Sequence, residues 1–196
     1  MKSSRLSLVV VLACFASACS SKKPPSSGEL VVTPASASPS LPGAAVEPLA
    51  NGSQPQPLAD VVAGKVAVVD LWATWCTACR DVSKNVELMA EAHRNQAFVA
   101  VGLAVGEERD VVSAFFGSAA PKIPIYLDTQ FRVADALGAR ELPTILVVDR
   151  DGKIRLVKKK VDGDVLRLVD KLLADEEKPA PGASAPAASA SASATP

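Results

Sequence analysis

A buried strand that runs into a pair of closely spaced cysteines constrains the fold of this chain more than any other feature. Val66–Trp72 is a continuous apolar and β-branched run, interrupted only by Asp70, and this is the pattern of a strand buried on both faces. Apolar residues then recur at helical spacing from Cys76 to about Arg94, and a second strand-like run follows over 97–105. This order predicts a βαβ unit in which the cysteines stand where the helix begins.

The rest of the central region continues the alternation of strands and helices. The sequence indicates a helix over 107–116, a strand over 123–127, a short helix over 130–137, strands over 144–148 and 153–157, and a closing amphipathic helix from about 165. The residues between the last two strands, Asp149 to Gly152, are typical of a hairpin turn. We therefore expect an α/β fold in which a central mixed β-sheet is flanked by helices on both faces.

Composition separates both ends of the chain from this domain. Residues 20–57 are rich in Pro, Ser, Ala and Gly with little apolar periodicity, and residues 176–196 are dominated by Ala, Ser and Pro. Such segments cannot bury enough apolar surface to offset the entropy lost when they are ordered. We expect a disordered tether over 20–57, one folded domain over 58–175 and a disordered tail over 176–196.

Residues 1–19 have the layout of a secretory signal peptide, with two basic residues before an apolar run over 6–15. The run is too short to span a bilayer as a stable helix. The small residues that precede Cys19 resemble a bacterial lipobox, in which the cysteine becomes the lipidated first residue of the mature protein. Cys19 is the preferred lipid attachment site, with Cys14 or an unmodified cleaved leader as alternatives. We expect a lipoprotein on the periplasmic side of a bacterial cell envelope, anchored to a membrane.

Charge and cysteine usage exclude some functions. Lys plus Arg and Asp plus Glu number 21 each, which gives a formal net charge of +0, so the chain carries no basic footprint for nucleic acid. Of the four cysteines, two lie in the leader, and the other two are too close in sequence to build a disulfide framework.

Cys76 and Cys79 suit thiol–disulfide exchange. A sulfur at a helix N-terminus lies near unpaired backbone N–H groups and the positive end of the helix dipole, which favour a thiolate. Cys76 is therefore the expected nucleophile, and Cys79 would close the disulfide or resolve a mixed one. The rival interpretation is a zinc site, which needs two further ligands, but His93 is the only histidine. We expect no metal, and no cofactor besides the redox-active disulfide itself.

Two motifs resemble those of a known family. The run VDLWATWCTAC over 69–79 resembles the active-site segment of thioredoxins and of the TlpA/ResA group of membrane-tethered thiol-disulfide oxidoreductases. The run LGARELPTILVVD over 137–149 resembles the cis-proline segment of the same group, and the similarity covers most of 58–174. The resemblance implies a thioredoxin-like fold and an enzyme that acts through Cys76 and Cys79.

The resemblance also implies roles for residues outside the cysteine pair. It implies that Pro143 is cis and lies beside the disulfide, and that the backbone of Leu142 pairs with a bound substrate strand. Trp75 is expected to cover the disulfide and, with Leu142 and Pro143, to bind substrate. Asp70 stands where thioredoxins carry a buried acid behind Cys79, and burial would raise its pKa toward a range useful for proton transfer. The alternatives are a trans strand-entry proline, and an acid bonded to backbone or turned to solvent.

The predicted function is thiol–disulfide exchange with exported proteins as clients. The leading hypothesis is a reductase, with cytochrome c maturation as one setting and a membrane electron donor of unknown identity. A disulfide oxidase or isomerase of the same fold, and a redox-inactive lipoprotein that serves as a binding module, are the alternatives. Thr77 and Ala78 replace the Gly-Pro pair of thioredoxins. Because residues between the cysteines tune thiolate stability, the sequence leaves the direction of electron flow open.

Overall fold

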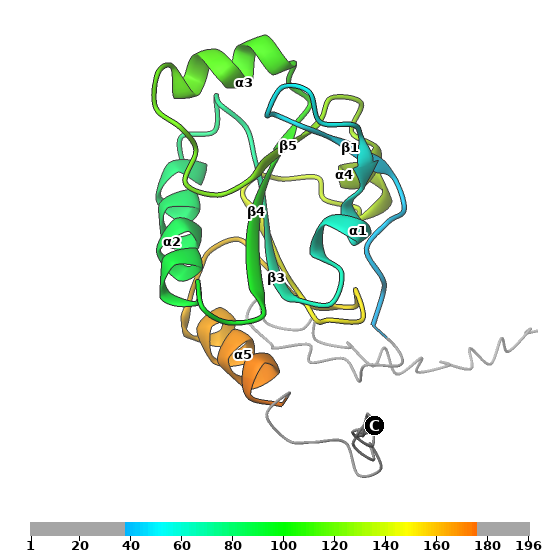
Figure 1. Cartoon of the computed structure of the whole chain (residues 1–196), viewed down its shortest axis with the longest axis vertical. Coiled ribbons are helices and arrows are strands. Elements are labelled where there is room, and N and C mark those ends of the chain that lie inside the picture. The colour runs from blue at the N-terminus through cyan, green and yellow to red at the C-terminus, as the bar shows by residue number, and fades with distance from the viewer. Residues whose placement is uncertain (1–37, 176–196) are drawn as a thin grey trace, which may run out of the picture.

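The structure, a computed structural model, describes residues 38–175, whose strands form one seven-stranded mixed sheet (Figure 1). The strands are β1 (Ala45–Pro48), β2 (Gln56–Pro57), β3 (Val66–Trp72), β4 (Phe98–Val105), β5 (Ile125–Asp128), β6 (Thr144–Val148) and β7 (Ile154–Lys158). Their order across the sheet is β2-β1-β5-β4-β3-β6-β7. β3 runs parallel to β4 and antiparallel to β6, and β4 runs parallel to β5. Because β3 lies between β4 and β6, every one of its residues is buried.

Helices cover both faces of the sheet. They are α1 (Leu58–Val62), α2 (Cys79–Ala92), α3 (Arg109–Phe116), α4 (Arg132–Ala136) and α5 (Gly163–Ala174). Figure 1 shows α2 and α5 on one side of the sheet, α1 and α4 on the other, and α3 at the top of the molecule. Within residues 38–175, no helix is long and apolar enough to cross a membrane.

Side-chain alternation along β3 divides the core into two halves. Val66 and Val68 pack with apolar residues of α2 and α5, whereas Ala67 and Val69 pack with those of α1 and α4. Because successive side chains of a strand point to opposite faces, Asp70 belongs with the first set and faces α2.

The predicted α/β architecture is confirmed, and most predicted elements differ from the observed ones only at their ends. The hairpin predicted at 149–152 joins β6 to β7, and the Asp149 carboxylate accepts hydrogen bonds from the backbone amides of Asp151 and Lys153. The helix predicted to begin at Cys76 begins at Cys79. The intervening residues form a turn instead, in which the Cys79 amide donates to the Cys76 carbonyl.

The fold begins earlier than the predicted boundary at residue 58. The predicted tether, 20–57, supplies β1 and β2, and Ser40 forms a bridge with Lys153. β1 pairs antiparallel with β5, and its Val46 is fully buried. These short strands are held by backbone pairing, so they show no apolar periodicity that the sequence could reveal. The predicted leader and its Cys19, residues 20–37, and the tail 176–196 lie outside the described residues.

Candidate active site

Cys76 and Cys79 lie between the end of β3 and the first turn of α2, where a disulfide joins them. The two residues are 6% and 1% exposed, so Cys79 is the more deeply buried. The Cys76 amide donates to the Ala73 carbonyl at 3.0 Å, which closes the loop that carries the disulfide. Among the described residues no side chain caps the start of α2 at Ala78. The Cys79 and Arg80 amides donate to the Cys76 and Thr77 carbonyls, so the positive end of the helix dipole is what can stabilise a thiolate here.

The Leu142–Pro143 peptide bond is cis, as the resemblance implied. Leu71 of β3 stands opposite Thr144 of β6, so the continued antiparallel register places Pro143 opposite Trp72. The loop with the two cysteines leaves β3 at this same end. The cis-proline and the disulfide therefore share one edge of the sheet, while the pairing of the Leu142 backbone with a client stays a prediction.

Asp70 is a buried acid in the middle of β3, with 1% of its surface exposed. The Ser83 hydroxyl of α2 donates to its Oδ2 at 2.6 Å, and no hydrogen bond from the described residues reaches its Oδ1. Burial raises the pKa of Asp70 from 3.8 to about 6, while the Ser83 hydrogen bond opposes this rise. The predicted direction is confirmed, and neither alternative holds because the carboxyl is bonded to a side chain and faces away from solvent.

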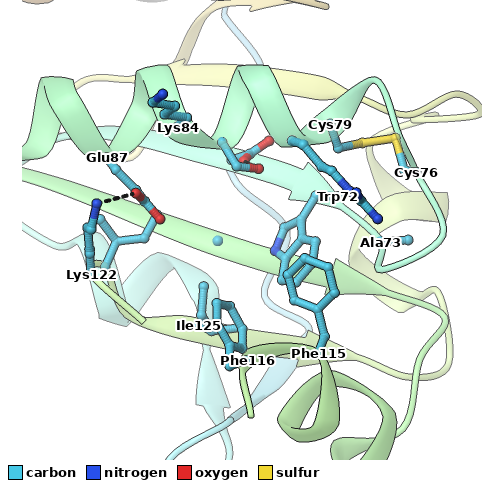
Figure 2. Close-up of a pocket in the computed structure, with 15 residues that line it drawn as sticks. Trp72, Ala73, Cys76, Cys79, Lys84, Glu87, Phe115, Phe116, Lys122 and Ile125 are labelled. Atoms are coloured by element: carbon cyan, nitrogen blue, oxygen red, sulfur yellow. Dashed lines mark hydrogen bonds and ion pairs between the residues drawn. A yellow bond between two sulfur atoms is a disulfide. The ribbon is translucent and has the colours of Figure 1, made fainter. Parts of the chain in front are cut away.

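A cavity of about 300 Å³ lies beside Asp70 and both cysteines. Figure 2 shows Trp72 between the Cys76–Cys79 disulfide and the rings of Phe115 and Phe116, which lie below Trp72 in this view. The Trp72 ring centroid is 5.3 Å from that of Phe115 and 5.9 Å from that of Phe116. Aromatic rings therefore line the cavity on the side of α3. Trp72 packs beneath the active-site loop.

Gly102 lines this cavity where two side chains pack tightly against β4. It stands opposite Asp70 in the β3–β4 register, and a Cβ at this position would lie 2.7 Å from Ile125 Cδ1. Farther from the disulfide, Lys122 and Glu87 approach each other at 3.4 Å, as the dashed line in Figure 2 marks. The cavity thus joins a buried carboxyl to a charged, partly exposed rim.

The two tryptophans of the active-site segment have opposite environments. Trp72 is 5% exposed, whereas Trp75 is 71% exposed and stands directly before Cys76 in the chain. An exposed aromatic ring at this position is available for contact with another protein. Its predicted place over the disulfide as a substrate-binding residue stays a prediction.

The sequence did not indicate Glu107 as a site residue. Its carboxylate accepts hydrogen bonds from the amide and the hydroxyl of Thr74, at 2.7 Å and 2.5 Å, and only 8% of Glu107 is exposed. The sequence placed Glu107 at the start of a helix, but it lies in the connection between β4 and α3. The signal that could have found it is the parallel βαβ unit, which brings the ends of β3 and β4 to one edge of the sheet.

The zinc interpretation needs two further ligands near the cysteine pair, and His93 is the only histidine. His93 caps the far end of α2, a helix of 14 residues, so it lies roughly 20 Å along the axis from Cys79. Its ring packs against Phe98 at a centroid distance of 5.2 Å. Within residues 38–175, no group of three or more His, Cys, Asp or Glu side chains could hold a metal ion. His93 is too far away to share a metal with the cysteines.

Comparison with known proteins agrees with this geometry. The Redoxin family profile matches residues 35–172. The thiol-disulfide oxidoreductase ResA of Bacillus subtilis is 30% identical over 91 residues, which are 46% of this chain and 51% of that protein. The chain spans about half the length of the curated relatives that it matches.

Solved structures share the fold. A secreted thiol-disulfide isomerase from Corynebacterium glutamicum aligns with a TM-score of 0.64 at 21% identity, covering 76% of this chain and 95% of that one. The thioredoxin domain of a thiol-disulfide oxidoreductase from Bacteroides vulgatus aligns with a TM-score of 0.60 at 19% identity, covering 69% and 96%. The predicted thioredoxin-like fold is confirmed.

Proposed function

The chain belongs to the Redoxin family, and on this premise we propose that it is an enzyme of thiol–disulfide exchange that acts through Cys76 and Cys79. The observation that carries the proposal is one edge of the sheet that combines a disulfide at a helix start, a cis-proline and a buried carboxyl. Curated relatives named thiol-disulfide oxidoreductase support it. A cysteine pair kept only for stability would gain nothing from the buried charge of Asp70 beside it.

The exchange proceeds in two displacements. The reduced Cys76 thiolate attacks one sulfur of a client disulfide, so that a mixed disulfide forms and the client's other sulfur leaves as a thiolate. Cys79 then loses its proton and attacks the Cys76 sulfur, which releases the client's second thiolate and forms the Cys76–Cys79 disulfide. Two electrons pass from the protein to the client, and the two client thiolates are protonated by the proton that Cys79 released and by one proton from solvent.

Asp70 accepts the proton that Cys79 loses in the second step. Cys79 and Asp70 line the same cavity, and Cys79 is too deeply buried to release a proton directly to bulk water. A carboxyl with a pKa of about 6 is ionised at neutral pH yet basic enough to hold a proton briefly. The Oδ1 atom, which accepts no hydrogen bond from the described residues, is the oxygen available for this transfer.

The proposed direction is reduction of the client. A buried negative charge at Asp70 disfavours a nearby thiolate, and the residues between the cysteines, Thr77 and Ala78, include no histidine that would stabilise one. Both features keep the reduced form less stable and the reduction potential low. Thioredoxin lies near about −270 mV and the oxidant DsbA near about −120 mV, so equilibration with glutathione separates the two directions. A value near that of DsbA would assign an oxidase.

The leader supports an extracytoplasmic location for this chemistry. A lipid on Cys19 would hold the domain at the periplasmic face of a bacterial membrane, where cysteines of exported proteins need reduction. Apocytochrome c is one proposed client. A membrane-bound thiol donor would return two electrons to the Cys76–Cys79 disulfide after each turnover.

Reduction of a protein disulfide by the purified chain tests the activity. With dithiothreitol as the electron source and insulin as the substrate, wild-type protein should accelerate the reaction and Cys76→Ser should not. Cys79→Ser should accumulate a mixed disulfide with insulin, which mass spectrometry detects. If the variant with both cysteines changed to serine keeps the full biological function in cells, the protein is a binding module instead of an enzyme.

A further inference from the structure

The loop that carries Cys76 is held by a carboxylate outside the proposed catalytic set, and we infer that this residue, Glu107, positions the cysteine pair and limits its thiolate. The inference rests on the proposed function and adds a residue to it. Glu107 is buried at the end of β4, and in the described residues both hydrogen bonds of its carboxylate come from Thr74.

The contact engages both donors that Thr74 possesses. The Thr74 amide donates to Oε2 at 2.7 Å and the hydroxyl donates to Oε1 at 2.5 Å. Hydrogen bonds to a charged acceptor are short and strong, and two in parallel fix orientation as well as distance. Thr74 lies two residues before Cys76, inside the turn that the Cys76 amide closes on Ala73. Glu107 therefore anchors the backbone from which Cys76 projects.

The sheet explains why Glu107 reaches this loop. Trp72 stands opposite Ala104 in the parallel β3–β4 register, so the extended register places Thr74 opposite Gly106. Gly106 adopts a φ of 72°, and a Cβ there would overlap the ring of Phe131. Only glycine readily adopts this positive φ and also has no Cβ to clash with Phe131. The turn at Gly106 brings Glu107 beside the end of β3.

The same contact places a negative charge near the Cys76 sulfur. Two residues span at most about 7 Å, so the carboxylate lies within roughly 12 Å of Cys76. This charge opposes the helix N-terminus, because it disfavours the thiolate that the helix stabilises. The other charged groups beside the cysteines line the cavity and stay unchanged in every variant below: Asp70 of β3, Arg80, Lys84 and Glu87 of α2, and Lys122 before β5.

Glu107→Gln tests the charge with little change of shape. The rate of Cys76 alkylation by iodoacetamide is measured against pH on the reduced protein, with mass spectrometry to identify the modified cysteine. We expect a lower Cys76 pKa and an alkylation rate at pH 7 that rises roughly threefold to tenfold. The equilibrium with glutathione should move toward the reduced pair. Glu108→Gln is the matched control, because it removes the same charge from the neighbouring exposed residue.

A folded Glu107→Gln protein with the wild-type Cys76 pKa and potential would overturn the inference, as would an equal shift in Glu108→Gln. If Glu107→Gln does not fold, Thr74→Val decides, because it keeps the carboxylate and removes one of its two donors. Its reaction with glutathione disulfide should slow roughly threefold or more, and Thr74→Ser should restore the rate. An unchanged Thr74→Val rate would overturn the inference. All these readouts use small reagents, so inactivity toward insulin would count against the proposed function alone.

Discussion

Replacing Asp70 by asparagine should stabilise the oxidised protein at pH 7 far more than at pH 4. Asparagine has nearly the shape of aspartate, and its amide oxygen can still accept the hydrogen bond from the Ser83 hydroxyl, which Oδ2 accepts at 2.6 Å. It carries no charge that burial in the centre of β3 would strip of water. The variant therefore removes the cost of a buried carboxylate and leaves the packing in place.

The size and sign of the effect follow from proton linkage. The pKa of Asp70 is about 6 in the folded protein and 3.8 without burial, so the folded state binds this proton more tightly than the unfolded state. The free energy of unfolding of the wild type therefore falls as the pH rises from about 4 to about 6, and levels off above that range. At roughly 1.4 kcal/mol per pKa unit, ionised Asp70 costs about 3 kcal/mol at pH 7 and less than about 1 kcal/mol at pH 4.

Urea unfolding followed by circular dichroism, without reductant and at several pH values from roughly 4 to 8, measures this difference, because the range runs from near the unfolded pKa of 3.8 to well above the folded pKa of about 6. The stability gap between Asp70→Asn and wild type should widen by about 2 kcal/mol between the two ends of the range. Asp151→Asn is the matched control, since Asp151 is an exposed carboxyl in the turn between β6 and β7. A gap that does not change with pH, or an equal effect in the control, would refute the reasoning.

Four further predictions concern the same site and the leader. Ser83→Ala removes the hydrogen bond that lowers the pKa of Asp70, so its free energy of unfolding should fall at higher pH than that of the wild type in the same urea series. A fall centred at the wild-type pH would contradict this prediction. Asp70→Asn should also slow insulin reduction, because Cys79 loses its proton acceptor, whereas equal turnover from roughly pH 6 to 9 would exclude that role. Gly102→Ala brings a Cβ within 3.0 Å of Trp72 Nε1 as well as against Ile125, and should lower the free energy of unfolding by about 1–3 kcal/mol. Mass spectrometry of the mature N-terminus should find a lipid on Cys19, and an unmodified start elsewhere would exclude the anchor.

Long buried elements of the fold were predictable because burial leaves a pattern in sequence. β3 is buried at all seven positions and α2 repeats its buried residues at helical spacing, so both were expected from the chain alone. β1 and β2 were not, because four and two residues are too short for a period, and their pairing is made by backbone groups that every residue carries.

The site residues also divide into those that the sequence predicts and those that it does not. The cysteine pair and its place at a helix start followed from spacing, and the raised pKa of Asp70 followed from its position in an apolar strand. The cis bond before Pro143 came only from a family resemblance, since local sequence leaves both isomers of such a bond open. The hydrogen bonds from Thr74 to Glu107 depend on a turn at Gly106 and on the ring of Phe131, which no local pattern links to the cysteines.

Asp70 is the residue whose presence stability alone does not explain. Among residues 38–175 this carboxyl has one hydrogen-bond partner, so in the centre of a sheet it destabilises the folded protein at neutral pH, and an apolar side chain of similar size would remove that cost. A cavity lies beside Asp70, and Gly102 opposite Asp70 has no room for a Cβ because Ile125 and Trp72 pack against it. Such a pairing of an unfavourable charge with an open cavity is typical of functional sites, where pKa values are shifted for chemistry. Since Cys79 lines the same cavity and must release a proton in the second displacement, proton transfer accounts for both the acid and the space beside it.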